Sequence, residues 1–162
     1  MAHPFTRLRD GSVRARLSEI EASIIRQVAG NVSEVVDEPP ESARRLFPIA
    51  YPDDADRQQN FAAMTRDELV RSKKAAAERV VASLEDARPA RGATECLLDE
   101  ETAQAWLRVL NDARLVLGTQ LDVSEDMDHT PLAEHDPRAP SFNMYLYLGA
   151  IQEALLDELR PG

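Results

Sequence analysis

The clearest fold signal in this chain is the stretch at residues 99–121, DEETAQAWLRVLNDARLVLGTQL. Its apolar side chains recur every three or four residues, which is the period of one face of an α-helix. Asp99 comes just before this run, and its carboxylate is of the type that accepts hydrogen bonds from the free N–H groups of a first helical turn. The stretch therefore predicts an amphipathic helix over 100–122.

Prolines and start signals mark three further helices. A helix interior disfavours proline, and long proline-free stretches separate the ten prolines of the chain. Ser18 with Glu21, and Thr65 with Glu68, have the spacing of a capping box. The last apolar stretch follows Pro140. The sequence predicts four main helices, at 18–36, 66–87, 100–122 and 142–159.

Residues 1–17 have a different pattern, with two short alternating runs on either side of Asp10-Gly11. This dipeptide favours a two-residue turn between antiparallel strands. Such a turn pairs Arg7 with Arg14 and gathers four arginines on one face. We call these residues the hairpin arginines: Arg7, Arg9, Arg14 and Arg16. The opposite face is apolar and is expected to cover the helices.

Together these elements predict a mainly α protein, a bundle of four principal helices with an N-terminal β-hairpin packed on it. Residues 37–64 are expected to be irregular, with one or two short helical turns. The length of 162 residues fits a single domain, 1–162. No apolar run is long enough for a membrane helix, and the N-terminus lacks an apolar signal core, so a cytoplasmic protein is expected.

The charge balance is acidic, with 29 Asp and Glu against 19 Lys and Arg and a net charge of -10. Because like charges repel, this balance argues against a protein that coats nucleic acid. The hairpin, in contrast, is basic. Its guanidinium groups are of the type that binds carboxylates and phosphates with two parallel hydrogen bonds. The hairpin arginines are therefore the candidate contact with a partner protein. The alternative is that they pair with acidic groups inside the chain.

Other candidate sites are weaker. Residues 122–136 carry six acidic residues and no Lys or Arg, which makes this segment a second candidate contact; its spacing matches no calcium loop, and no metal site is predicted. Cys96, the single cysteine, precedes a helix start and is a candidate redox thiol or a buried apolar side chain. No catalytic set and no phosphate-binding glycine loop is found, so neither an enzyme nor a cofactor is predicted.

The last helix, 142–159, is apolar around more than half of its circumference. Such a helix either lies at the centre of the bundle or shares its apolar face with a second chain. The sequence therefore predicts a central helix and leaves a homodimer through this helix as the alternative.

Three segments resemble a known family in the same order along the chain: the basic hairpin, RLFPIAYPDD at 45–54 and LDEETAQAWLRVLNDARLVLGTQL at 98–121. The chain is similar to an actinobacterial family of unknown function that includes AosR-type oxidative-stress transcriptional regulators. The resemblance implies a cytosolic regulatory role through contact with transcription machinery, and it implies no catalytic residue. A redox switch within one chain needs two cysteines, so Cys96 leaves only an intermolecular disulfide or a sulfenic acid.

The sequence thus leads to one expected function and two alternatives. We expect a non-enzymatic regulatory and interaction module that is associated with transcription and acts through protein–protein contact. The first alternative is a regulator that binds DNA directly. The second, less favoured, is an enzyme whose residues form no recognised motif.

Overall fold

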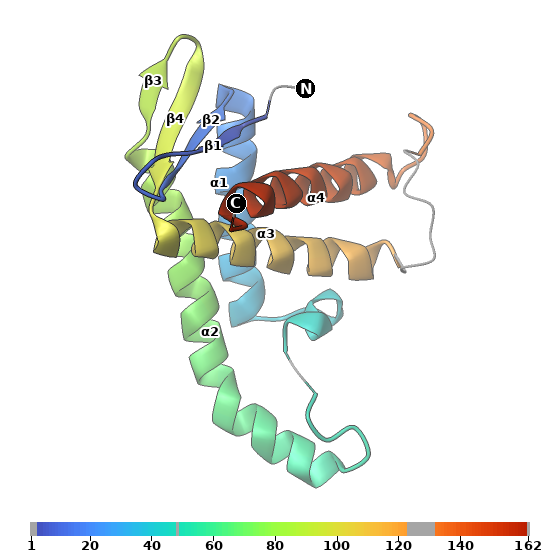
Figure 1. Ribbon diagram of the computed structural model, residues 1–162. Helices are drawn as coiled ribbons and strands as arrows, with labels where there is room; N and C mark the ends of the chain where they lie inside the picture. Colours follow the sequence, from blue (N-terminus) through green and yellow to red (C-terminus); the bar gives the residue numbers. More distant parts are fainter. Residues whose placement is uncertain (1–2, 48, 123–131, 162) are drawn as a thin grey trace.

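The computed structural model describes residues 3–47, 49–122 and 132–161 (Figure 1). The chain is mainly α, with four principal helices and an N-terminal β-hairpin, and this confirms the predicted fold class. The elements follow one another as β1 (Phe5–Arg7), β2 (Val13–Leu17), α1 (Glu19–Asp37), the 3₁₀ helix η1 (Glu41–Leu46), α2 (Ala55–Glu85), β3 (Arg88–Ala90), β4 (Ala93–Leu98), α3 (Glu100–Gln120) and α4 (Ala139–Leu159).

Two helix starts lie where the local capping signals place them. At α1, the Glu21 amide donates to Ser18 Oγ at 3.1 Å, and the Ser18 amide donates to Glu21 Oε1 at 3.0 Å, which completes the capping box. At α3, the Thr102 amide donates to Asp99 Oδ1 at 2.8 Å. These side chains satisfy N–H groups that the first turn of a helix leaves free.

The other two helices begin earlier than predicted. Helix α2 begins at Ala55, because Asp54 caps it by accepting from the Arg57 amide at 3.1 Å. The predicted capping box at Thr65 is wrong: this residue lies inside α2 and its hydroxyl donates to the Phe61 carbonyl at 2.8 Å. Helix α4 begins at Ala139 and has a proline in its first turn, where the missing N–H costs no hydrogen bond.

The N-terminal hairpin belongs to a four-stranded antiparallel sheet with the order β1-β2-β4-β3. Neither β3 nor β4 was predicted from the sequence, where Cys96 was expected only to precede a helix start. Residues 93–98 form a strand because β2 offers a complementary partner, with Ala15 opposite Cys96 and Val13 opposite Leu98. Figure 1 shows the sheet at one end of the molecule, beside α1 and the end of α2.

The turn of the first hairpin contains three residues instead of the predicted two. The Leu8 amide donates to the Ser12 carbonyl at 2.8 Å, and the Gly11 amide donates back to the Leu8 carbonyl at 3.0 Å. Gly11 has a φ of 90°, the positive value that the last residue of such a three-residue loop adopts and that glycine tolerates.

This extra turn residue shifts the strand register by one. Arg7 pairs with Val13, and Thr6 pairs with Arg14. Because a shift of one residue moves a side chain to the other face, Arg7 does not share a face with Arg14. The predicted common face of all four hairpin arginines is therefore wrong.

Trp106 joins the sheet to the helices. This side chain is fully buried, and its Nε1 donates to Ser83 Oγ on α2 at 2.9 Å. Phe5 on β1 meets the indole edge-on, with 6.2 Å between the ring centroids. The inner face of the sheet thus closes one end of the helical core. Within the described residues, none of the helices is long and apolar enough to cross a membrane.

Candidate interaction surface

The outer face of the sheet carries two cross-strand rows of side chains. Paired residues share a face, and neighbours along a strand alternate between faces. Val13, Ala15 and Leu17 are buried and mark the inner face. Six residues on the opposite face form what we call the outer sheet surface: Thr6, Arg14 and Leu97 in one row, and Arg16, Glu95 and Arg88 in the other.

The outer sheet surface is basic, with three arginines against one glutamate. Arg16 is partly engaged, since its Nη2 donates to the Ala90 carbonyl at 3.3 Å and its Nε lies 4.0 Å from Glu95 Oε2. Arg14 Nε is buried and has no hydrogen-bond partner in the part of the chain that the structure describes. The guanidinium of Arg14 is thus not held by an internal acceptor at this nitrogen.

The remaining hairpin arginines lie elsewhere. Arg7 fastens β1 to the end of α4: its amide donates to Glu158 Oε2 at 3.1 Å and its Nη1 donates to the Arg160 carbonyl at 3.1 Å. Arg9 is exposed in the turn and forms no ion pair with another described residue. The structure therefore brings two of the four predicted arginines onto one face and gives Arg7 an internal role. Binding of a partner by the hairpin arginines stays a prediction.

Four members of the outer sheet surface were not predicted from the sequence: Thr6, Arg88, Glu95 and Leu97. Leu97 is 65% exposed, and Arg88 lies on the edge strand opposite Glu95. The dipeptide Arg91-Gly92 joins β3 to β4 with φ values of 50° and 79°, the positive values of a tight hairpin turn. In the sequence only Gly92 marks this turn, because arginine does not favour a positive φ, so the second hairpin carries a weak local signal.

Cys96 lies on the inner face of the sheet. Its side chain is 2% exposed, and burial raises the pKa of the thiol from 9.0 to about 11. The thiolate is the reactive form of cysteine, so little of this side chain is reactive at neutral pH. These are the properties of a core side chain, while the redox role stays a prediction.

The acidic segment 122–136 falls largely outside the described residues, since 123–131 are not described. At its end, the Asp136 carboxylate accepts from Arg138, and these hydrogen bonds lower the pKa of Asp136. Among the described residues, no group of three or more His, Cys, Asp or Glu side chains is arranged to hold a metal ion. The contact predicted for this segment thus stays a prediction.

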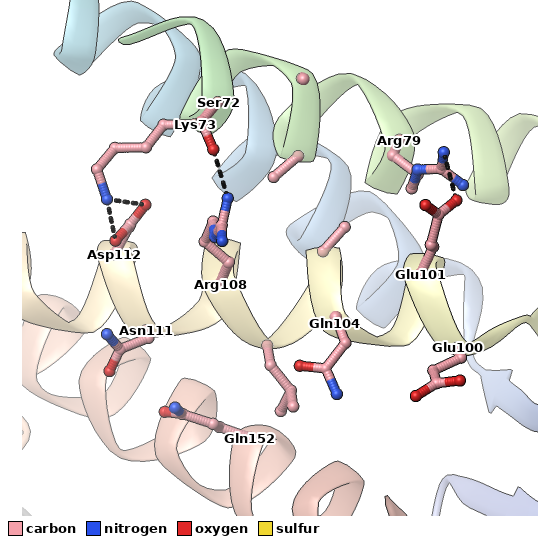
Figure 2. A pocket seen from close by; sticks show the side chains of 14 residues that line it. Ser72, Lys73, Arg79, Glu100, Glu101, Gln104, Arg108, Asn111, Asp112 and Gln152 are labelled. Carbon is pink, nitrogen blue, oxygen red and sulfur yellow. Dashed lines mark hydrogen bonds and ion pairs between the residues drawn. The ribbon is translucent and has the colours of Figure 1, made fainter. Parts of the chain in front are cut away.

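A groove of about 830 Å³ runs along α2 and α3 (Figure 2). Several of its polar side chains pair with one another: Arg79 Nη2 lies 3.1 Å from Glu101 Oε2, and Arg108 donates to Ser72 Oγ. Figure 2 shows these pairs bridging the two helices, with Gln104 and Gln152 nearby. These interactions link two helices, and they leave the charged groups of the pairs occupied.

The deepest of these pairs joins Lys73 to Asp112. Lys73 Nζ lies 3.0 Å from Asp112 Oδ1 and 3.1 Å from Oδ2, and the two side chains are only 12% and 5% exposed. Burial raises the pKa of Asp112, while the attraction of Lys73 acts in the opposite direction. Neither residue was singled out from the sequence, because a single Lys and a single Asp on different helices carry no local signal.

The fold and the site define a mainly α protein that carries a small antiparallel sheet with one exposed, basic face. The chain belongs to the family described as domain of unknown function, DUF2017, whose family model matches residues 2–159. This membership confirms the resemblance that the sequence analysis identified.

Curated relatives come from mycobacteria. The chain is 28% identical over 186 residues to the oxidative stress regulator AosR of Mycobacterium tuberculosis and to that of Mycobacterium bovis, covering 91% of this chain and 83% of each relative. A relative in Mycobacterium leprae is 30% identical over 141 residues, which cover 79% of this chain and 61% of that protein. No solved structure matches the chain.

Proposed function

We propose that this protein is a cytoplasmic, non-enzymatic regulator associated with transcription, which acts through contact with another protein. The regulator names of its relatives support the regulatory part of this proposal. The observation that carries the contact is the outer sheet surface, where three arginines surround an exposed leucine on a chain of net charge -10. The pairing of Lys73 with Asp112 and of Arg79 with Glu101 in the α2–α3 groove supports a role other than catalysis.

The composition of the outer sheet surface favours a protein over a nucleic acid. Leu97 is 65% exposed, and an apolar side chain gains nothing from a phosphate. Glu95 lies between Arg16 and Arg88 in the same row and repels phosphate groups. Protein interfaces, in contrast, combine a buried apolar anchor with arginines around it.

Direct DNA binding is the second candidate function. Two strands of a sheet fit the major groove of DNA, and the guanidinium groups of Arg14 and Arg16 suit phosphates as well as carboxylates. A protein of this kind binds a specific duplex with an affinity that falls steeply as salt rises. A mobility-shift experiment at low salt tests this candidate, and a specific shift that is lost with added salt supports it.

A pull-down experiment from the lysate of the source organism tests the proposed function. The wild-type chain is compared with the double variant Arg14→Glu and Arg88→Glu, which reverses two charges on the outer sheet surface. The matched control is Arg45→Glu with Arg71→Glu, two exposed arginines on η1 and α2. Circular dichroism first establishes that all three proteins are folded.

We expect the wild type and the control to capture the same partner, and the double variant to capture at least about tenfold less of it, since a reversed charge turns attraction into repulsion. Equal capture by all three proteins would show that the outer sheet surface is not the contact.

A further inference from the structure

Both edges of the sheet are closed to an added strand. On β1, the Arg7 amide is already used by Glu158 Oε2 at 3.1 Å. On β3, which spans only Arg88–Ala90, Pro89 has no N–H to donate. Partners that extend a sheet need a free row of backbone donors and acceptors. A partner of this sheet therefore has to contact its outer face through side chains.

The outer face combines an apolar anchor with cations at short range. Leu97 is directly opposite Arg14, so their Cβ atoms lie about 5 Å apart, and Arg16 is the diagonal neighbour of Leu97 at about 7–8 Å. Arg88 and Glu95 complete the next row. A partner side chain that covers Leu97 thus places its own sequence neighbours within reach of the arginines.

The arginines differ in how they are occupied. Arg16 has an internal acceptor, the Ala90 carbonyl, and a nearby carboxylate, Glu95. Within the described residues, Arg14 and Arg88 form no ion pair; the side chain of Arg14 is half-buried, and Arg88 is exposed on the edge strand. A guanidinium that forms no internal ion pair gains most when its exposed nitrogens bind an incoming carboxylate, because it gives up no internal ion pair.

We propose that the outer sheet surface binds an acidic segment of a partner protein, in which one apolar side chain covers Leu97 and the carboxylates on either side of it bind Arg14 and Arg88. This inference rests on the proposed function and specifies its partner. Arg16 stays paired with Glu95 and does not bind the acidic segment, so the contact with the partner ends beside it. The segment lies across the strands on the face of the sheet and does not extend the ladder.

A screen of a randomised displayed peptide library against the full-length chain tests this proposal. We expect the bound peptides to be enriched in Asp and Glu on both sides of Leu, Ile or Phe. The most enriched peptide is then synthesised with a fluorescent label, and its dissociation constant is measured by fluorescence anisotropy. Peptides enriched in basic or in purely apolar residues, or the absence of any enrichment, would overturn the proposal.

Matched variants assign the binding to the surface. We expect Leu97→Ser and Arg14→Gln each to weaken binding by about tenfold or more, in line with the loss of one buried apolar contact or one charge-assisted hydrogen bond. The controls are Met64→Ser and Arg71→Gln, an exposed methionine and an exposed arginine on α2, and they should bind as the wild type does. Equal effects of test and control variants would refute the assignment.

Three further results distinguish an acidic segment from other occupants of the outer sheet surface, and distinguish failure of this proposal from failure of the proposed function. Displacement of the peptide by duplex DNA, with the same dependence on Arg14, would overturn it in favour of phosphate recognition. A dimer of the wild type that dissociates in the Leu97→Ser variant would assign the surface to a second copy. A screen without enrichment, together with a lysate partner that is lost from the charge-reversed variant, would refute the acidic segment and leave the proposed function standing.

Discussion

The structure places Cys96 in the core, and it was predicted to be a redox thiol or a buried apolar side chain. A thiol near a helix start can have a lowered pKa, but this one lies opposite the buried Ala15 on the inner face of the sheet. Its side chain is 2% exposed. Burial in apolar surroundings disfavours the charged thiolate, so the chemistry of this thiol follows its surroundings and not its position in the sequence.

Because the pKa of Cys96 is raised in the folded chain, the stability of the chain changes with pH in the alkaline range. The thiol has a pKa of about 11 in the folded chain and 9.0 ordinarily, so the folded state holds a proton that the unfolded state has lost. Because the unfolded state then binds fewer protons, the free energy of unfolding falls as the pH rises from about 9 to about 11, by about 2 kcal/mol. Urea unfolding followed by Trp106 fluorescence measures this decrease.

The variant Cys96→Ala is the control for this measurement, since every other titrating group is retained. Its stability should decrease less than that of the wild type over the same pH range. Thiol labelling gives a second measure, and we expect slow labelling in buffer and fast labelling in urea. Fast labelling of the folded chain at neutral pH would contradict the buried state.

Local signals predicted those elements that depend on neighbouring residues alone. Ser18 and Asp99 cap α1 and α3 as expected, because a cap needs only the first turn that follows it. The hairpin turn at Asp10-Gly11 was also located correctly. Its loop length was not, since the same dipeptide fits both a two-residue and a three-residue turn and the partner strand β4 fixes the register.

Elements that depend on distant residues could not be predicted in this way. The strand Ala93–Leu98 is so short that its sequence pattern does not distinguish a strand from an irregular segment before a helix. Its partner, β2, lies much earlier in the sequence. The outer sheet surface depends on this pairing, so only two of its members, Arg14 and Arg16 on β2, were predicted. The start of α2 at Ala55 was missed because its first half is polar and little buried, which weakens the helical period.

The buried ion pair between Lys73 and Asp112 links α2 to α3, and its two partners depend on each other. Removing one partner leaves a buried charge without compensation, so we expect Asp112→Ala to lower the free energy of unfolding by about 3–5 kcal/mol. The double variant Lys73→Met with Asp112→Leu should recover most of this loss, because it removes both charges and keeps the volume. Urea unfolding measures all of these values.

A second ion pair of α2 offers a matched control. Lys74 Nζ lies 2.6 Å from Asp37 Oδ2 on α1, but the two side chains are 34% and 50% exposed. Solvent screens such a pair, so Asp37→Ala should cost less than about 1 kcal/mol. Similar losses for the variants at Asp37 and Asp112 would show that burial does not set the strength of the α2–α3 link.

At the scale of the whole molecule, the apolar last helix finds its partners within one chain. Phe142, Leu148, Ile151 and Leu155 are buried, and α4 packs along α3 (Figure 1). Within the described residues, the exposed large apolar side chains all lie outside α4. Helix α4 packs against α3 and β1 and keeps several apolar side chains half-buried, among them Met144, Leu146 and Leu156. It therefore lies beside α3 and not at the centre of the bundle, and the homodimer through this helix, which the sequence left as an alternative, stays a prediction.

Light scattering coupled to size exclusion tests this arrangement. Because α4 presents no large exposed apolar side chain, we expect a mass close to that of one chain, 18.0 kDa, at all concentrations. A concentration-dependent mass of two chains would contradict this expectation. The variant Leu97→Ser would then show whether α4 or the outer sheet surface forms the dimer.

Pairing of β2 with β4 also dictates the order of events when the chain folds during synthesis. Helices α1 and α2 contain their own hydrogen bonds and can form as they leave the ribosome, whereas β2 has to wait for residues 94–98. Until then Phe5 lacks Trp106, its partner across the core, and the apolar side of the first hairpin faces water. We therefore expect the nascent chain to acquire its helices first and its sheet only after α3 has emerged.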